Sequence, residues 1–134
     1  MAVVVSQLVV DCAEPAALAR WWAEVLGWEV VHDPDEEPDV AIVPPEGAGA
    51  WLFQRVPEPK SVKNRLHVDV RPQNGSSQAE ELERLVDLGA RPVDIGQGDV
   101  TWHVLADPEG NEFCLLRSTP AELEALLARR AASD

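Results

Sequence analysis

Two side chains that can exchange protons lie two residues apart near the middle of the chain. His67 and Asp69 belong to residues 65–71, where apolar and polar residues alternate. Since alternate side chains of a strand project from the same face, both would project from the polar face of a strand. The carboxylate of Asp69 can then fix the tautomer of the imidazole, or it can pair with Arg65. The pattern indicates acid–base chemistry or ligand binding.

Cys114 is a further candidate for a reactive side chain. With His67 it could form a thiolate nucleophile pair, in which the imidazole takes the thiol proton. A cysteine between Phe113 and Leu115 is, however, more often a small apolar side chain of the core. Cys114 is therefore a candidate ligand-binding residue before it is a candidate nucleophile. Trp102 is a further candidate, because an indole ring can stack on a planar ligand.

Two glutamines extend this set to four related positions. A shift of 60 residues carries Gln7 onto His67 and Gln54 onto Cys114. If the chain consists of two related halves, strand alternation places all four side chains on faces turned away from the helices. A curved sheet would gather them in a mostly apolar hollow with a few polar groups, which is what a small-molecule site requires. The alternative is that each is a hydrogen-bonded residue of an ordinary core.

The order of elements that would position these residues occurs twice in the sequence. In the first half, residues 3–11 are rich in β-branched side chains, Pro15 suits the first turn of a helix, and Gly27 suits its end. Apolar residues recur between Pro15 and Gly27 at three- and four-residue spacing. Three short strand candidates follow, at residues 28–32, 39–43 and 50–56. The first half therefore predicts the order β-α-β-β-β.

The second half repeats this order after residues 57–64, which have no apolar period and are predicted to form a linker. The strand at residues 65–71 precedes the capping box Ser77-Gln78-Ala79-Glu80, and Gly89 ends the helix. Three more strands are predicted at residues 91–95, 100–106 and 112–117. A final amphipathic helix opens with a second capping box, and it would serve for packing or for contact between copies of the chain.

These patterns predict an α+β fold in a single domain, residues 1–134. Module one covers residues 3–56 and module two covers residues 65–117, with the linker 57–64 between them and the C-terminal helix at residues 119–132. The two βαβββ modules would form a curved mixed sheet around a central cup, with the helices outside.

Composition restricts the partners and the compartment. The net charge of -13, from 24 acidic and 11 basic residues, disfavours a nucleic-acid partner. No basic segment precedes the first apolar run and no stretch is long enough to cross a bilayer, so neither secretion nor membrane insertion is expected. Two cysteines do not make a disulfide framework, and they fit a reducing compartment. We expect a cytoplasmic protein.

Two segments and the repeated order of elements resemble a known superfamily, over residues 3–117. It is the glyoxalase / bleomycin resistance protein / dioxygenase (vicinal oxygen chelate) superfamily, in its glyoxalase-like branch. The segments are Lys63-Asn64-Arg65-Leu66-His67-Val68-Asp69 and Asp107-Pro108-Glu109-Gly110-Asn111-Glu112-Phe113. The resemblance implies a fold that binds small molecules, and it implies dimers. Metal ligands of that superfamily are commonly His or Gln, Glu, His and Glu, and by position they fall on Gln7, Gln54, His67 and Cys114.

Both glutamates of that pattern are absent from this chain. Hard divalent ions prefer anionic oxygen ligands, whereas Gln54 offers a neutral amide and Cys114 a sulfur. We therefore expect a small-molecule binding protein, or an enzyme whose acid–base groups do the work of a metal, without a cofactor. The alternatives are a metal-dependent lyase, isomerase or dioxygenase with a divalent metal on Gln7, His67 and Cys114, and a domain that binds only proteins. The expected ligand-binding residues are Gln7, Gln54, His67, Asp69, Cys114 and Trp102.

Overall fold

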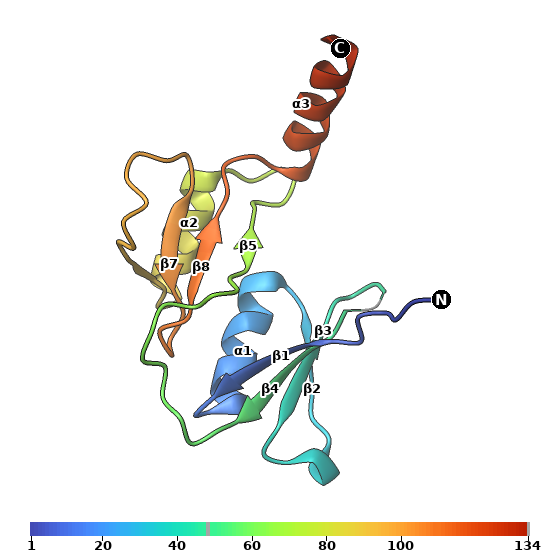
Figure 1. Cartoon of the computed structure of the whole chain (residues 1–134), viewed down its shortest axis with the longest axis vertical. Helices are drawn as coiled ribbons and strands as arrows, with labels where there is room; N and C mark the ends of the chain where they lie inside the picture. The colour runs from blue at the N-terminus through green and yellow to red at the C-terminus, as the bar shows by residue number, and fades with distance from the viewer. Residues whose placement is uncertain (48, 134) are drawn as a thin grey trace. The chain divides into compact units, whose positions relative to one another are not determined.

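The chain forms two compact units, residues 1–61 and 62–134, and the computed structural model describes residues 1–47 and 49–133. Each unit has its own four-stranded mixed sheet and follows the order β-α-β-β-β (Figure 1). The predicted α+β class, with two βαβββ modules and a C-terminal helix, is confirmed. The boundary between the units falls inside the predicted linker, residues 57–64. The closure of both modules around one cup in a single domain stays a prediction.

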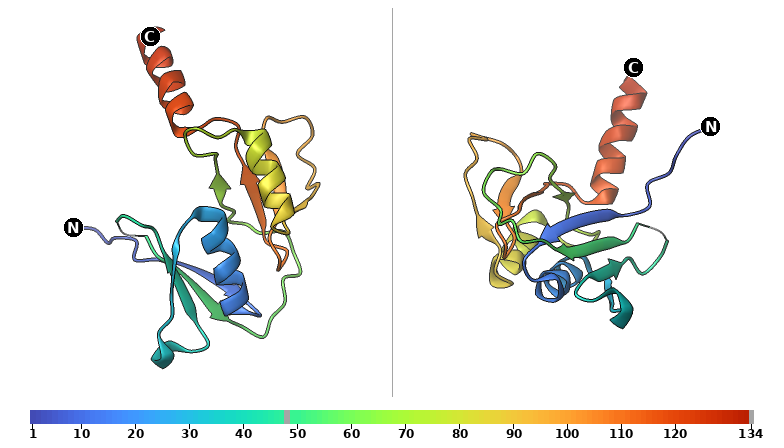
Figure 2. Two further views of the ribbon diagram at one scale, coloured as in Figure 1. Left: turned by 180° about the vertical axis from the view of Figure 1, so that it is seen from behind. Right: turned by 60° about the horizontal axis from the view of Figure 1, so that its bottom comes forward.

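The first unit is a mixed sheet with one helix on it. Its strands are arranged in the order β1-β4-β3-β2, with β1 parallel to β4 and the other pairs antiparallel. The helix covers one face of this sheet (Figure 2). The elements are β1 (Leu8–Cys12), α1 (Pro15–Leu26), β2 (Glu29–Val31), a 3-10 turn η1 (Pro34–Glu36), β3 (Val40–Val43) and β4 (Trp51–Arg55).

The core of this unit lies between α1 and the sheet. Leu18 and Trp22 of α1 are buried, as are Ile42 and Phe53 of the sheet. The indole of Trp51 contacts that of Trp22, with ring centroids 5.4 Å apart. Tryptophans of this unit therefore serve packing, and the helix ends as predicted at Gly27, whose φ of 71° is left-handed.

β1 is shorter than the predicted strand at residues 3–11. It begins at Leu8, which pairs with Trp51 at the first residue of β4. Residues before Leu8 have no strand to pair with, because β1 lies at the edge of the sheet and β4 is its neighbour. Val3, Val4 and Val5 are consequently more than nine-tenths exposed. β-branched composition alone does not make a strand when no partner strand runs beside it.

The second unit repeats the arrangement. Its strand order is β5-β8-β7-β6, again with one parallel pair, β5 with β8. Ser77 caps the helix as predicted, since its hydroxyl accepts a hydrogen bond from the N–H of Glu80 at 3.2 Å. Leu85 of the helix and Leu105, Phe113 and Leu115 of the sheet are buried. The elements are β5 (Asp69–Val70), α2 (Gln78–Asp87), β6 (Arg91–Pro92), β7 (His103–Ala106), β8 (Glu112–Leu115) and α3 (Pro120–Ser133).

Several strands of this unit are shorter than predicted. β6 stops at Pro92 because side chains then take the backbone N–H groups: Asp94 accepts from Gly96 and Gln97 accepts from Ile95, both at 2.8 Å. β5 has two residues instead of the seven of residues 65–71. Leu66, an apolar residue of the predicted strand, is 86% exposed. It lies outside the core because it precedes the part of the chain that pairs with β8.

α3 begins with the predicted capping box. The hydroxyl of Thr119 accepts from the N–H of Glu122 at 3.2 Å, and the carboxylate of Glu122 accepts from the N–H of Thr119 at 3.3 Å. The helix projects away from the sheet of its unit (Figure 1). Among the described residues, no helix combines the length and the apolar character that a membrane crossing needs.

Candidate functional site

His67, Asp69 and Cys114 come together in the second unit. Their possible ligand atoms all lie within 4.8 Å of one another. Asp69 of β5 pairs in register with Cys114 of β8, and Nδ1 of His67 lies 3.3 Å from Oδ1 of Asp69. The side chains of His67 and Asp69 are about half exposed, whereas Cys114 is buried at 6% exposure. A reachable histidine–carboxylate pair thus lies over a buried thiol, and we call these three residues the triad.

Asn64 ties the segment before His67 to the second sheet. Its backbone N–H donates to Oε2 of Glu112 at 3.0 Å, and its side-chain amide donates to Oδ1 of Asn111 at 3.4 Å. Further along, the N–H of Cys114 donates to the carbonyl of Val68 at 2.9 Å. The two segments that carry the superfamily resemblance, residues 63–69 and 107–113, are therefore hydrogen-bonded to each other, and together they position the triad.

Asp107 organises the turn between β7 and β8. Its side chain is fully buried, and its Oδ1 accepts from the N–H groups of Glu109 and Asn111, each at 2.9 Å. The side-chain amide of Asn111 donates to the same carboxylate. The central part of Asp107 in this turn was not predicted from the sequence. An aspartate followed by proline at the start of a turn was the available signal.

The thiol of Cys114 is held in its protonated form. Burial raises its pKa above the ordinary value, and both the negative charge of Asp69 and a hydrogen bond to that carboxylate raise it further. The charge of Lys63 acts in the opposite direction and is the smallest effect. A thiolate nucleophile needs a lowered pKa, so these surroundings oppose nucleophilic catalysis by Cys114.

Alkaline pH is expected to destabilise the folded chain through Cys114. The pKa of its thiol is higher in the folded state than the ordinary value of 9.0, so above that pH the unfolded chain loses a proton that the folded chain retains. The contribution to stability is present below pH 9.0 and is lost as the pH rises through the folded pKa. The melting temperature of the native chain should therefore fall more steeply above pH 9.0 than that of Cys114→Ser, whose hydroxyl does not titrate there. Equal slopes would contradict the assignment.

The sequence left open whether Asp69 contacts the imidazole of His67 or pairs with Arg65, and the structure shows the contact with His67. Its carboxylate lies beside Nδ1 of His67. A carboxylate accepts hydrogen bonds, so this contact favours the tautomer with the proton on Nδ1 and leaves Nε2 as the acceptor. Nε2 of the partly exposed His67 side chain is then the ring nitrogen available to accept a hydrogen bond from a bound molecule.

Gln7 and Gln54 belong to the first unit and do not lie side by side within it. Gln7 immediately precedes β1, Gln54 is in β4, and both are exposed. The register pairs Gln54 with Asp11, which is four residues after Gln7, or about 13 Å along an extended chain. Asp11 is therefore the residue of β1 beside Gln54, and it was not among the residues predicted for the site.

No single shift in residue number relates the pair β1–β4 of the first unit to the pair β5–β8 of the second. Gln54 and Cys114 differ by 60 positions, whereas their strand partners Asp11 and Asp69 differ by 58. The shift of 60 that related Gln7 to His67 therefore does not hold for β1 and β5. In each parallel pair of strands an aspartate lies opposite the residue that occupies an expected glutamate position of the superfamily. Asp11 lies opposite Gln54, and Asp69 lies opposite Cys114. The meeting of Gln7 and Gln54 with the triad stays a prediction.

Trp102 lies just before β7, the strand that pairs with Cys114 of β8. Val104 pairs with Cys114, and Trp102 is two residues before Val104, just outside β7. By strand alternation the indole belongs on the face of Cys114 rather than on the helix face. It is 39% exposed. Its place fits the predicted stacking role without testing it.

Comparisons with known proteins agree with this fold. The family model described as "Glyoxalase-like domain" matches residues 7–116. None of the curated proteins matches the sequence. Among solved structures, a FosX fosfomycin resistance protein from Mesorhizobium loti has a TM-score of 0.62 at 16% identity, covering 93% of this chain and 99% of its own. A likeness at this identity concerns the fold alone.

Two further structures show the range of proteins that share this fold. A FosX protein from Listeria monocytogenes, in complex with Mn(II) and a dihydroxypropylphosphonic acid, has a TM-score of 0.64 at 12% identity, covering 91% of this chain and 95% of its own. TnmS3, an antibiotic binding protein from Streptomyces, has a TM-score of 0.59 at 18% identity, covering 88% of this chain and 99% of its own. Because the family model spans most of the sequence, the chain belongs to the glyoxalase-like domain family of the vicinal oxygen chelate superfamily.

Proposed function

We propose that this chain binds a small molecule at the triad and acts on it, or sequesters it, through acid–base groups rather than through the His/Glu metal centre of its superfamily. The observation that carries the proposal is the His67–Asp69 contact of 3.3 Å beside a protonated, buried Cys114. His67 supplies the proton acceptor and Asp69 orients it. Gln7, Gln54 and Trp102 would complete the ligand site.

The solved structures support a small-molecule ligand. They include a protein described as antibiotic binding, one described as an oxidase, and a fosfomycin resistance protein in complex with a phosphonic acid. The same fold thus accompanies ligand binding and catalysis, and function within it depends on the residues of the site. In this chain the superfamily's glutamate positions hold Gln54 and Cys114, which is why we place acid–base chemistry before metal chemistry.

A metal-dependent lyase, isomerase or dioxygenase is the second candidate, because the donor atoms of the triad lie within 4.8 Å of one another. Imidazole, carboxylate and thiolate together suit zinc, and they are a poor set for Mn²⁺ or Mg²⁺. Cys114 would have to lose its proton to bind an ion, and its raised pKa opposes that step. Elemental analysis of chain purified without chelator decides: stoichiometric divalent metal that leaves in His67→Ala would defeat the acid–base proposal.

A ligand screen tests the proposal directly. Compounds that bind at the triad should raise the melting temperature of the native chain, and His67→Ala should abolish that rise. His32→Ala is the matched control, because His32 is an exposed histidine of the other unit that also pairs with a carboxylate, Glu37, at 2.9 Å. It should leave the rise unchanged. If no compound raised the melting temperature while a protein partner bound tightly, the chain would be the protein-binding domain considered above.

The buried thiols and the net charge of the chain support a cytoplasmic protein without a nucleic-acid or membrane partner. The thiols of Cys12 and Cys114 are both buried in their own units, as expected of a chain that stays in a reducing compartment. The net charge of -13 repels phosphate backbones and anionic lipid surfaces. We also propose that the chain forms a homodimer, and the last helix suggests how.

A further inference from the structure

We propose that α3 pairs with α3 of a second copy of this chain, antiparallel and around a twofold axis. The first observation is that leucine side chains on one face of the helix are exposed. Leu126 and Leu127 are 47% and 54% exposed, and Leu123 is half-buried. These residues recur at three- and four-residue spacing, so they form one stripe. A helix of 14 residues is marginal in water unless such a stripe packs against something.

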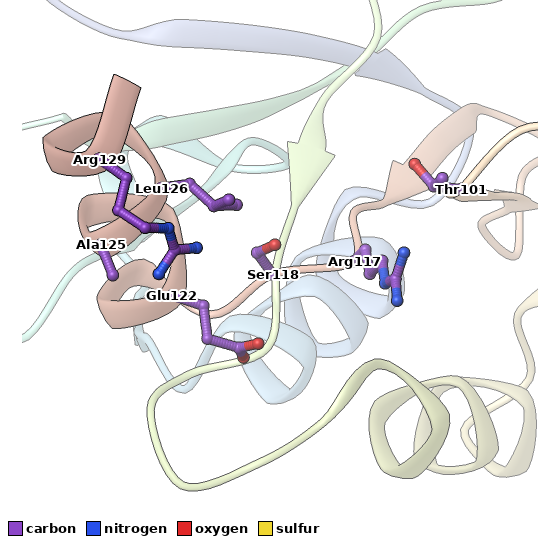
Figure 3. Close-up of a pocket in the computed structure, with 7 residues that line it drawn as sticks. All are labelled: Thr101, Arg117, Ser118, Glu122, Ala125, Leu126 and Arg129. Atoms are coloured by element: carbon purple, nitrogen blue, oxygen red, sulfur yellow. The ribbon is translucent and has the colours of Figure 1, made fainter. Parts of the chain in front are cut away.

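A shallow groove of about 550 Å³ runs beside this helix within the second unit. On the helix side it is lined by Glu122, Ala125, Leu126 and Arg129, which project from the same side of α3 (Figure 3). The opposite wall consists of Thr101, Arg117 and Ser118. The groove gives an incoming helix a place beside the leucine stripe.

The charges of α3 identify the occupant. Glu122 and Arg129 are seven residues apart, which is two helical turns, so they lie on the same edge of the stripe with Leu126 between them. In an antiparallel pair, residues on the same edge meet across the interface. Glu122 of each copy then faces Arg129 of the other, and both ion pairs form at once. The helix is therefore complementary to itself, as a twofold contact requires.

The contact is small and should be reversible. Fourteen residues span about 21 Å, and a helix pair of this length buries less than the roughly 1,200 Å² typical of stable interfaces. We expect the average mass in sedimentation to rise from monomer toward dimer with concentration. Leu126→Glu should shift the midpoint of that rise to at least about tenfold higher concentration, because it places a charge in the stripe.

Charge exchange tests the direction of pairing. Arg129→Glu alone places two carboxylates against each other at each contact, and Glu122→Arg alone places two guanidinium groups together, so each variant should be monomeric where the native chain is dimeric. Mixing the two variants should restore dimers, because both like-charged contacts are then relieved in the mixed pair, and the double variant should dimerise by itself. Glu124→Arg is the control on the other edge of the helix and should behave as the native chain does. Circular dichroism checks that α3 still forms, since Glu122 also caps it.

Three results would overturn the proposal. They are a native chain that stays monomeric at its highest soluble concentration, single variants that dimerise like the native chain, and a mixture that stays monomeric. A parallel pair would bring Glu122 beside Leu127 instead, so the charge exchange would have no effect. None of these outcomes depends on the ligand of the triad, and the function proposed above stands or falls separately.

Discussion

Replacing Asp107 by alanine is expected to lower the free energy of unfolding of the second unit by about 3 kcal/mol, one of the largest losses available to a single substitution outside the apolar core. The carboxylate is fully buried and accepts from two backbone N–H groups and one side-chain amide. Alanine would leave these donors without an acceptor in a place where water cannot replace it. Urea unfolding followed by fluorescence measures the loss.

Asp94→Ala is the matched control. Asp94 also accepts from a backbone N–H two residues later, that of Gly96 at 2.8 Å, but its loop is exposed and water can take its place. Its loss should cost less than about 0.5 kcal/mol. Asp107→Asn keeps one acceptor oxygen and should fall between the two. If Asp107→Ala and Asp94→Ala cost the same, burial of the turn is not what gives Asp107 its importance.

The consequence of Asp107→Ala should reach the triad as well. The turn fixes Asn111 and Glu112, and these residues accept from Asn64, which holds the segment before His67. Loosening the turn therefore frees the histidine from the register that places it against Asp69. A stability defect and a ligand-binding defect should appear together.

Periodicity and turn chemistry were enough to predict the fold. The caps of Ser77 and Thr119 form the hydrogen bonds that their sequence pattern indicates, and Gly27 ends its helix in the left-handed conformation. These are local signals, in which residues a few positions apart determine the backbone. Strand lengths are not local. β1 covers only the residues that β4 accompanies, and β5 ends at Val70, opposite Leu115 at the end of β8. No pattern within residues 3–11 or 65–71 reports these limits.

The proximity of the triad residues was predictable only in part. Strand alternation groups His67 with Asp69, whose side chains lie 3.3 Å apart, and Cys114 lies beside them because β5 and β8 are neighbours in the sheet. The register between strands could not be read from the sequence, because a shift of two residues preserves the alternation of faces. The sequence therefore could not show that Asp11, rather than Gln7, is the residue of β1 that pairs with Gln54. The protonation of Cys114 follows from its burial against a carboxylate, which is also a tertiary property.

Restoring the missing glutamates should create a site for a hard metal ion. In Cys114→Glu a carboxylate joins His67 and Asp69, whose potential ligand atoms already lie within 4.8 Å of that position. Adding Gln54→Glu supplies the second anionic oxygen of the superfamily pattern. Because Mn²⁺ prefers anionic oxygen ligands, we expect the double variant to bind it at least about a hundredfold more tightly than the native chain, or about 2.7 kcal/mol. Loss of the free Mn²⁺ signal in electron paramagnetic resonance measures the affinity.

The comparison of Cys114→Glu with the double variant separates the local part of this prediction from the distant part. Cys114→Glu changes only the second unit, where the triad lies, so any gain it shows is local. A further gain on adding Gln54→Glu arises only if β4 brings residue 54 to the same ion, which is the convergence that the sequence predicts. Gln73→Glu adds the same charge at an exposed position and should bind no additional Mn²⁺. Melting curves establish that each variant is folded, since Cys114 is buried and glutamate is larger. If the folded double variant binds no more tightly than Cys114→Glu alone, Gln54 lies away from His67 and Cys114, and the ligand site is confined to the second unit.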